Sequence, residues 1–469
     1  MIFQKRKNIK LCIIFAIFLF LIFSGFSCKI QTAAEKEAIK PVSLEFWGVF
    51  DNSDDYNEVF SAYKALHPNI TIKYKKLRYE EYKQKLLEAF AEGESPDIFS
   101  IHNTWIGEYN DKIEPMPESV KMPFQEEKGS IKKEIITTIK KVPSISLLKL
   151  KNDFVEVVYD DCVINKNGKS EIICLPFSLD TLAMFYNRDI MNAAGIPEAP
   201  KIWSEFQDIV KNITKYNGDG EIIQSATALG EANIERGVDI LSLLMMQNGA
   251  NMEEDKRVMF NMPIGKENLS AQVGYTPGLE AFKFYKAFSD PSKEVYTWNN
   301  KMPNSLDAFI QGRVALFFGY SYHNPIIKAR SPKLNFAIAS VPQIALEGAQ
   351  PVNISNYWVQ VISDKSKNKD IAWNFIQFVA TNPKVANLYL NKTKKPTALR
   401  SLINEQLNDM EIYPFASEIL TAKSWYKGKN AGAMEKIFAD MVSSVGAESE
   451  DKEFQSSLNE AARKIGQTY

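Results

Sequence analysis

The chain has 469 residues, of which 45% are hydrophobic and 24% are charged, a composition typical of a globular protein with a large core. Its length predicts two or three domains. The formal net charge of -1 provides no basic field, so a nucleic-acid partner has no electrostatic support. Four cysteines without a CxxC pair and three widely spaced histidines argue against a disulfide scaffold and a metal enzyme. We expect no metal and no cofactor.

The amino terminus has the pattern of an export signal. Basic residues within positions 5–10 precede the apolar run Leu11–Phe23, so residues 1–27 are assigned to the signal rather than to the fold. This pattern predicts that the mature protein works outside the cytoplasm. Residues 28–41 are polar and lack aromatic side chains, which predicts a flexible tether.

The small residues before Cys28 resemble a bacterial lipobox, with Cys28 as the lipidated first residue of the mature protein. The match is imperfect, because Gly25 stands where that motif usually has Leu. The alternative is an uncleaved membrane anchor, since residues 11–27 approach the roughly 17-residue minimum for spanning a bilayer. We favour the lipoprotein, and either alternative predicts a protein tethered to the cell membrane.

The first part of the folded chain predicts a parallel α/β layer, because strand and helix patterns alternate. The predicted elements are, in order, strand Val42–Phe46, helix Tyr56–Leu66, strand Ile70–Tyr74, a helix around Leu86–Phe90 that ends at Gly93, and strand Asp97–Ile101. Ligands of such sheets lie at the carboxyl ends of the strands. Those ends are Trp47–Asp51 and His102–Trp105.

A β-hairpin is predicted over Val155–Pro176, with Asn167 and Gly168 at its tip. A loop over residues 167–169 would place Cys162 directly opposite Cys174, and opposed cysteines can form a disulfide in an oxidising compartment. Two buried free thiols are the equally weighted alternative.

The apolar run at residues 182–186 predicts a buried strand that follows Asp180 and Thr181. Asn187 can cap a helix that ends before Gly195. Further predicted elements are helices from Trp203, over Val238–Gln247, over Leu279–Phe288 and over Ile371–Ala380, strands Val314–Phe318, Phe336–Val341 and Tyr357–Ile362, and a helical carboxyl end.

The stretch around Asp180 carries a resemblance to a known family. Its motifs are Leu175-Pro-Phe177, Asp180-Thr181, Tyr186-Asn-Arg-Asp189, Ala194-Gly-Ile196 and Trp203-x-Glu205. In this order they resemble the family 1 extracellular solute-binding proteins, the capture subunits of ABC importers for sugars. Looser matches extend the resemblance over nearly all of the chain after Pro41; they begin near Leu44, His67, Ser95, Ala308 and Ser363.

The resemblance implies an α/β, two-lobed periplasmic-binding-protein-like fold of type II. Each lobe would be a sheet flanked by helices, with hinge strands crossing between the lobes and a ligand cleft that closes by hinge motion. We expect residues 42–181 and 361–401 to form lobe one, and residues 182–360 and 402–469 to form lobe two.

Aromatic and polar residues at predicted strand ends are the candidates for the ligand site, because a sugar needs flat apolar platforms and fixed hydrogen-bonding partners. The resemblance implies a sugar-contacting carboxylate at Asp180, cleft-facing positions at Asp51, Asn103 and Trp105, and stacking positions at Tyr320 and Trp425. Trp358 is added because of its place at the interlobe strand. Trp47 and Tyr322 complete the predicted set by their place at strand ends. Any one aromatic residue is more often part of a core, and Trp203 is assigned to structure.

No P-loop, dinucleotide fingerprint, GxSxG elbow or HExxH motif is present, so the sequence favours binding over catalysis. The resemblance implies a monomer that captures a sugar or oligosaccharide and delivers it to membrane permease subunits served by a separate ATPase. The alternatives are another polar solute, such as a polyol, phosphodiester or metal chelate, and a secreted carbohydrate-active enzyme. The enzyme would need two carboxylates facing each other across the cleft.

Overall fold

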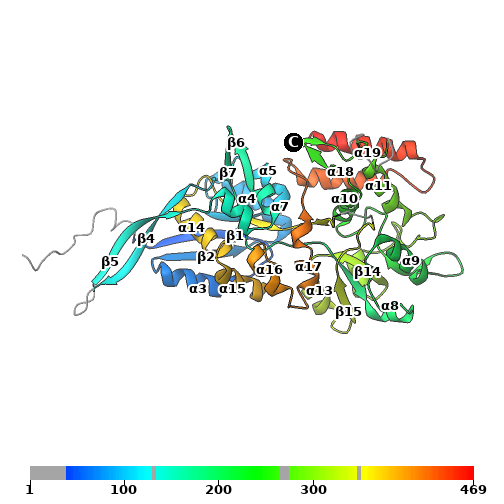
Figure 1. Cartoon of the computed structure of the whole chain (residues 1–469), viewed down its shortest axis with the longest axis horizontal. Coiled ribbons are helices and arrows are strands. Elements are labelled where there is room, and N and C mark those ends of the chain that lie inside the picture. The colour runs from blue at the N-terminus through cyan, green and yellow to red at the C-terminus, as the bar shows by residue number, and fades with distance from the viewer. Residues whose placement is uncertain (1–38, 129–133, 265–273, 346–349) are drawn as a thin grey trace, which may run out of the picture.

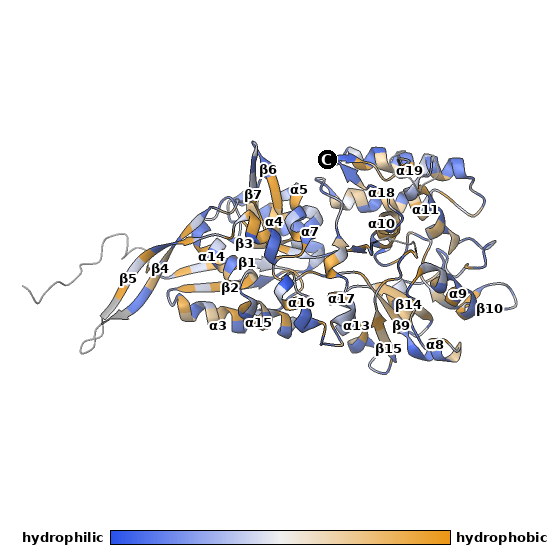
Figure 2. Cartoon of the chain, viewed as in Figure 1, coloured by the Kyte–Doolittle hydropathy of each residue, from blue (hydrophilic) through white to orange (hydrophobic). Residues whose placement is uncertain are grey.

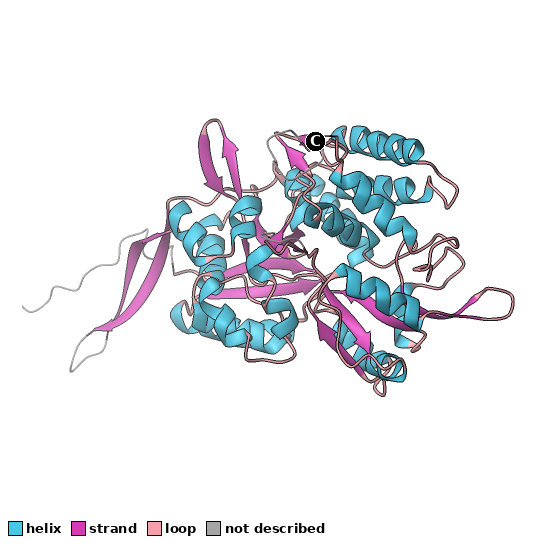
Figure 3. Ribbon diagram, turned by 45° about the vertical axis from the view of Figure 1, so that its right-hand side comes forward, coloured by secondary structure: helices cyan, strands magenta, loops and turns pink. Residues whose placement is uncertain are grey.

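The computed structural model describes residues 39–128, 134–264, 274–345 and 350–469. In Figure 1 they form two α/β bodies that lie side by side, and in Figure 3 helices flank the sheet of each body. The predicted two-lobed α/β fold is therefore confirmed. The predictions for the export signal and for Cys28 lie outside the described residues.

Lobe one is built on a five-stranded sheet with the order β2-β1-β3-β17-β8. Strand β1 pairs in parallel with both β2 and β3, as the alternating pattern predicts, whereas β17 is antiparallel to β3. The strands are β1 (Val42–Gly48), β2 (Ile70–Lys76), β3 (Ile98–His102), β8 (Leu175–Pro176) and β17 (Trp358–Ile362). The helices and 3-10 turns of this lobe are η1 (Ser53–Tyr56), α3 (Asn57–Leu66), α4 (Tyr79–Glu92), η2 (Asn103–Trp105), α5 (Ile106–Tyr109), α6 (Leu147–Asp153), α7 (Glu156–Cys162), α14 (Lys369–Ala380), α15 (Pro383–Thr393) and α16 (Arg400–Gln406).

Lobe two is built on the sheet β10-β11-β14-β9-β15. Every residue of β14 is buried, and the strand is correspondingly orange in Figure 2. The strands are β9 (Ala183–Asn187), β10 (Lys215–Tyr216), β11 (Ile222–Thr227), β14 (Val314–Gly319) and β15 (Phe336–Ala339), with a separate pair β12 (Glu253–Glu254) and β13 (Arg257–Val258). The helices and one 3-10 turn are α8 (Arg188–Ala193), α9 (Trp203–Ile213), α10 (Gly237–Gln247), α11 (Pro277–Ala287), α12 (Ser305–Ile310), α13 (His323–Arg330), α17 (Tyr413–Ala416), η3 (Ile419–Thr421), α18 (Ala431–Ser443) and α19 (Asp451–Gly466).

Segments of chain that cross between the lobes are hydrogen-bonded to one another. Thr181 and Ser355 form an antiparallel bridge, and β16 (Asn353–Ile354) pairs in parallel with β18 (Ala422–Lys423). The whole of β17 belongs to the sheet of lobe one, so the second crossing lies before Trp358 rather than at residue 361. These crossings bring residues distant in sequence to the junction of the lobes.

The helix predicted after β9 is present with the predicted ends. The Asn187 side chain accepts hydrogen bonds from the N–H groups of Asp189 (2.9 Å) and Ile190 (3.1 Å), which satisfies free donors at the start of α8. Gly195 follows the helix with φ +71°, a conformation that glycine adopts without steric cost.

The hairpin predicted over residues 155–176 is wrong in its first part. Residues 156–162 form helix α7 instead, because Val157, Val158, Asp161 and Cys162 share one buried helical face. Only β6 (Val163–Lys166) and β7 (Lys169–Ile172) form a hairpin.

The register of this hairpin also differs from the predicted one, since Lys166 pairs with Lys169 and not with Ser170. Cys162 and Cys174 nevertheless form a disulfide in the structure, with 5.1 Å between their Cα atoms. It joins the end of α7 to the chain just after β7. The bond therefore closes the base of the hairpin rather than linking opposed positions within it.

The antiparallel ribbon of β4 (Ser119–Lys128) and β5 (Glu134–Pro143) was not predicted from the sequence. It extends away from the body of lobe one, as Figure 1 shows. It lies far from the junction of the lobes and does not contribute to the site described below.

Candidate ligand-binding site

A cavity of about 320 Å³ lies at the junction of the lobes. Lobe one, lobe two and the crossing segments all contribute side chains to its lining. Its lining includes Phe50, Asp51, Tyr79, His102, Trp105, Asp180, Glu235, Arg236, Ser321, Tyr322, Asn356, Trp358, Lys395 and Glu435.

The ends of several strands bring these residues together. Strands β1 and β3 are parallel, so the residues that follow them, Phe50 and Trp105, lie at the same edge of the sheet. Strand β17 runs the other way and begins at this edge, where Trp358 is paired in register with His102. Tyr322 follows the end of β14 in lobe two. The site is thus assembled at the sheet edges, as the sequence predicts for this fold.

Aromatic rings form one wall of the cavity. Phe50 stacks on Tyr322 across the two lobes, with ring centroids 6.0 Å apart and an interplanar angle of 8°. It also stacks on Tyr79 (5.9 Å), and Trp105 meets Trp358 edge to face (5.3 Å). Phe50 and Tyr79 are 48% and 47% exposed, so part of each ring surface is free of protein contacts. Such faces can stack against the CH groups of a ligand.

Asp180 lies in the crossing before β9 and accepts hydrogen bonds from lobe two and from its own neighbour in the crossing. Its carboxylate accepts from the N–H (2.9 Å) and the hydroxyl (2.6 Å) of Ser321 and from the N–H of Thr181 (3.0 Å). Burial raises the pKa of the Asp180 carboxyl to about 7, although these hydrogen bonds favour its charged form. Asp180 therefore both lines the cavity and connects the crossing segment to lobe two.

Asp51 also lines the cavity, but its carboxylate is engaged by protein partners. It accepts hydrogen bonds from the hydroxyls of Tyr56 and Tyr389, each at 2.8 Å, and pairs with Lys395. Burial alone would raise the pKa of Asp51, yet Lys395 and these hydrogen bonds hold it below its usual value. Asp51 is thus an ionised group that positions Lys395 at the cavity.

A polar network lies beside the aromatic wall. His102 Nε2 is 2.8 Å from Asn356 Oδ1, and the Asn356 amide donates to Asp239 (3.3 Å). Asp239 also accepts from the Nε (2.8 Å) and Nη2 (2.6 Å) atoms of Arg236 and from the hydroxyl of Tyr320 (2.6 Å). Burial lowers the pKa of His102 to about 4, so the ring is neutral at neutral pH and its Nε2 donates to Asn356.

Arg236 adopts a left-handed backbone conformation, with φ +57°, immediately before α10. Backbone strain of this kind in a non-glycine residue is concentrated at functional sites. Glu435 of α18 also lines the cavity, and burial raises the pKa of its carboxyl group. The two side chains give this end of the site both a cation and a carboxyl group.

Of the nine predicted ligand residues, Asp51, Trp105, Asp180, Tyr322 and Trp358 line the cavity. The structure places the other four, Trp47, Asn103, Tyr320 and Trp425, outside the lining. The Asn103 amide donates to Asp161 (3.2 Å), and the ammonium of Lys75 lies 4.2 Å from the centre of the Trp47 ring. Tyr320 is fully buried, and its hydroxyl donates a hydrogen bond to the carboxylate of Asp239.

Trp425 is part of the core of lobe two. It is 7% exposed, its indole N–H donates to the hydroxyl of Ser242 (3.2 Å), and its ring packs against Phe260 and Phe438. These contacts place the indole in the core, and the stacking role of Trp425 stays a prediction. Among the described residues no cluster of three or more His, Cys, Asp or Glu side chains could hold a metal ion.

Sequence reasoning missed Phe50, Tyr79, Arg236 and Glu435. Phe50 and Tyr79 follow the ends of β1 and β2, so the rule that selected Asp51 and Trp105 could also have found them. Arg236 lies in a loop and Glu435 on a helix, and neither has a local sequence signal.

Two α/β lobes that enclose a cavity lined by aromatic and polar side chains define a bilobal binding protein. The model of the family described as bacterial extracellular solute-binding protein matches residues 51–386, more than half of the chain. The chain belongs to this family, and its function is solute binding.

Individual relatives are distant. A putative binding protein of Brucella abortus is 24% identical over 332 residues, which cover 69% of this chain and 68% of that protein. A maltotriose-binding protein of Pyrococcus abyssi is 21% identical over 397 residues, covering 81% and 71%. The crystal structure of a cyclo/maltodextrin-binding protein complexed with maltotetraose has a TM-score of 0.67 at 15% identity, covering 91% of this chain and 97% of that one. This structural likeness shows the fold.

Proposed function

We propose that the protein captures a sugar or oligosaccharide between its lobes and delivers it to the membrane permease subunits of an ABC importer, which a separate ATPase drives. The observation that carries the proposal is the pair of half-exposed aromatic faces, Phe50 and Tyr79, inside a cavity that also holds polar side chains. The maltotriose-binding relative and the maltotetraose-bound structural neighbour support the same ligand class.

The chemistry of the cavity suits a sugar. The rings of Phe50, Tyr79 and Trp358 offer apolar platforms for its CH faces. Asn356, Arg236 and Glu435 offer donors and acceptors for its hydroxyl groups. Water would be displaced from the apolar faces while the hydroxyl groups keep hydrogen-bonding partners, which is the balance that a polar ligand requires.

The proposal includes closure of the lobes around the ligand. Phe50 and Tyr322 come from different lobes, and the crossing segments are the natural hinge because they connect the two sheets along the chain. Separation of Phe50 from Tyr322 would expose to an entering ligand the face of each ring that now contacts the other ring.

The proposal also places the protein outside the cytoplasm as a monomer, tethered to the membrane through a lipid on Cys28 or through its apolar amino-terminal segment. The family is one of extracellular proteins, which supports the location. Within residues 39–128, 134–264, 274–345 and 350–469, no helix is long and apolar enough to cross a membrane.

Hydrolysis of a carbohydrate is a second candidate because Asp180 is not the only acid in the cavity. Asp51, Glu80, Glu235 and Glu435 also line it, and burial raises the pKa of both Asp180 and Glu435, as expected of a general acid. Membership of a binding-protein family favours capture without chemistry. Incubating the protein with each oligosaccharide that binds and assaying for new reducing ends separates the two functions.

A thermal-shift screen tests the ligand class. The panel should contain mono- and oligosaccharides together with a polyol, a phosphodiester and a metal chelate. A ligand present at about 100 times its dissociation constant stabilises the folded protein by about 2.7 kcal/mol. We expect sugars alone to raise the melting temperature; a response confined to one of the other solutes would overturn the sugar assignment.

A further inference from the structure

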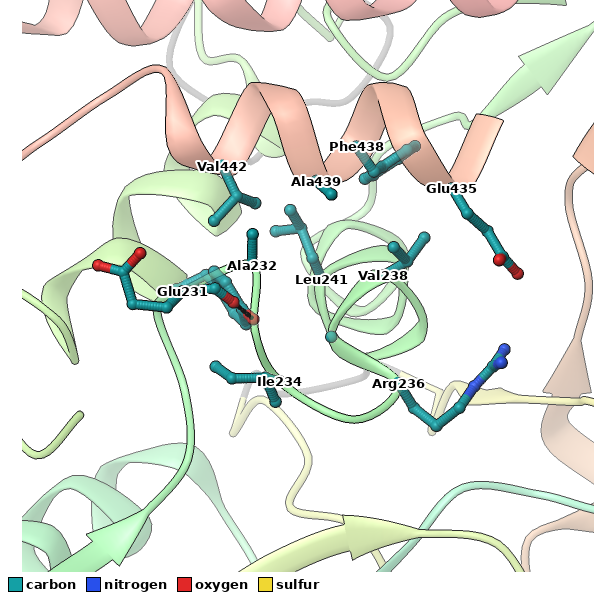
Figure 4. Close-up of a pocket in the computed structure, with 12 residues that line it drawn as sticks. Glu231, Ala232, Ile234, Arg236, Val238, Leu241, Glu435, Phe438, Ala439 and Val442 are labelled. Atoms are coloured by element: carbon teal, nitrogen blue, oxygen red, sulfur yellow. Dashed lines mark hydrogen bonds between the residues drawn. The ribbon is translucent and has the colours of Figure 1, made fainter. Parts of the chain in front are cut away.

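A second pocket of about 180 Å³ opens beside the interlobe cavity, between the loop before α10, α10 itself and α18 (Figure 4). Side chains from both helices point into it. Its apolar lining comes mainly from Ala232, Ile234, Val238, Leu241, Phe438 and Ala439.

This side pocket adjoins the interlobe cavity. Arg236 and Glu435 line both spaces, and Figure 4 shows them together at one end of the side pocket. At the other end lies Glu231, whose carbonyl oxygen accepts a hydrogen bond from the hydroxyl of Tyr285 (2.9 Å). Charged groups therefore mark the two ends, and an apolar interior lies between them.

The apolar interior is unsuited to a sugar ring. Hydroxyl groups moved from water into contact with Leu241, Val238 and Phe438 would lose hydrogen bonds without replacement, which is costly. An apolar group would gain from the same transfer. A wholly apolar cavity of about 150 Å³ can bind benzene, so a pocket of this volume has room for a group of that size between its charged ends.

We propose that the side pocket receives a benzene-sized apolar substituent of the captured solute, whose polar part occupies the interlobe cavity. The inference rests on the proposed function and narrows its substrate class to sugars that carry an aryl or short alkyl group. Arg236 and Glu435 would then lie at the junction, where the polar part of the ligand meets the apolar part.

Ala439→Leu is the test variant, because it places a larger apolar side chain into the pocket from α18. Ala433→Leu is the matched control: the residue lies on the same helix, is half-buried like Ala439 and lines neither cavity. Titration calorimetry should compare the methyl and phenyl glycosides of each sugar that binds. We expect the phenyl glycoside to bind about ten- to a hundredfold more tightly than the methyl glycoside.

This preference should fall below about threefold in Ala439→Leu and persist in Ala433→Leu. Equal affinities of the two glycosides for the wild-type protein, or a preference unchanged in Ala439→Leu, would overturn the inference.

Benzene alone provides a test that does not depend on sugar binding. It should raise the melting temperature of the wild-type protein and of Ala433→Leu, but not that of Ala439→Leu. If no sugar binds, the proposed function fails, and the benzene result then decides whether the pocket accepts an apolar group. No stabilisation of the wild-type protein by benzene would refute the pocket assignment, even if sugars bind.

Discussion

The carboxylate of Asp180 accepts hydrogen bonds from both the main-chain N–H and the hydroxyl of Ser321. Asp180 belongs to the first crossing between the lobes, and Ser321 follows β14 in lobe two. The pair therefore fixes the sheet of lobe two to the crossing at the edge of the ligand cavity. A residue with this double role should affect both stability and binding when it is changed.

The titration of Asp180 should appear in the pH dependence of stability. An aspartate in an unfolded chain has a pKa of about 3.9, whereas burial raises the pKa of Asp180 to about 7 in the folded protein. The folded state then binds the proton more tightly, so this stabilisation is complete below the unfolded pKa and is lost as the pH rises through the folded pKa. Between these values the slope should be at most about 1.4 kcal/mol per pH unit.

The measurement is urea unfolding of the wild-type protein and Asp180→Asn at several pH values between 4 and 8. Asparagine keeps the size of the side chain but does not titrate, so the contributions of other groups cancel in the difference. We expect the advantage of the wild-type protein to shrink as the pH rises. A constant difference would show that Asp180 titrates normally, and a growing one would show that folding lowers its pKa; both outcomes contradict the prediction.

Phe50→Ala should reduce affinity without destabilising the free protein. The ring is 48% exposed and stacks mainly on Tyr79 and Tyr322, so its removal costs little core packing. Loss of one aromatic platform should weaken binding of the sugar found by the screen about tenfold. The control is Tyr413→Ala, an aromatic residue that is 50% exposed and does not line the cavity. Calorimetric affinities that fall equally in both variants would remove Phe50 from the site.

Trp425→Ala should have the opposite effect. Because the indole is buried against Phe260 and Phe438, its removal should lower the free energy of unfolding by about 3–5 kcal/mol and leave the affinity of the remaining folded protein within about twofold. Trp358→Ala, at the cavity, is the comparison and should weaken binding more than Trp425→Ala. Chemical denaturation and calorimetry measure the two effects. A large loss of affinity with normal stability in Trp425→Ala would restore its predicted stacking role.

The fold was predictable from sequence where burial pattern and local signals agree. The alternating and apolar runs at β1, β2 and β3, and the Asn187 cap with Gly195 beyond, gave elements that the structure contains. The interpretation was wrong at residues 156–162, which the sequence analysis assigned to the hairpin whose tip is Asn167 and Gly168. Burial of one helical face in the tertiary structure accounts for the helix there.

The site was only partly predictable, because strand ends mark where a cleft lies but not which way each side chain points. Trp105 and Trp425 have the same chemistry, yet one lines the cavity and the other completes a core. Arg236 reaches the site through a left-handed backbone conformation, and Glu435 reaches it through packing of α18 on α10. Contacts of this kind depend on the tertiary arrangement and leave no periodic signal in the sequence.

Acylation of Cys28 remains a prediction, motivated by the charged and apolar residues before it. Cells that express the full chain should incorporate a labelled fatty acid into the wild-type protein and not into Cys28→Ser. Loss of the label should be accompanied by release of the protein from the membrane fraction. Membrane retention of unlabelled Cys28→Ser would instead indicate an uncleaved apolar anchor, and label retained in that variant would contradict acylation at Cys28.

The disulfide between Cys162 and Cys174 should stabilise lobe one because it lowers the conformational entropy of the unfolded chain. The cysteines are 12 residues apart in sequence, and a loop of about this length contributes at most about 3 kcal/mol by the chain-entropy argument. The double variant Cys162→Ala/Cys174→Ala should therefore unfold at lower urea concentration, and a reducing agent should destabilise the wild-type protein but not the variant. Thiol titration of the unfolded, non-reduced mature protein should find no free thiol besides Cys28. Two additional thiols would refute the bond, and equal stability with and without reducing agent would show that it contributes nothing.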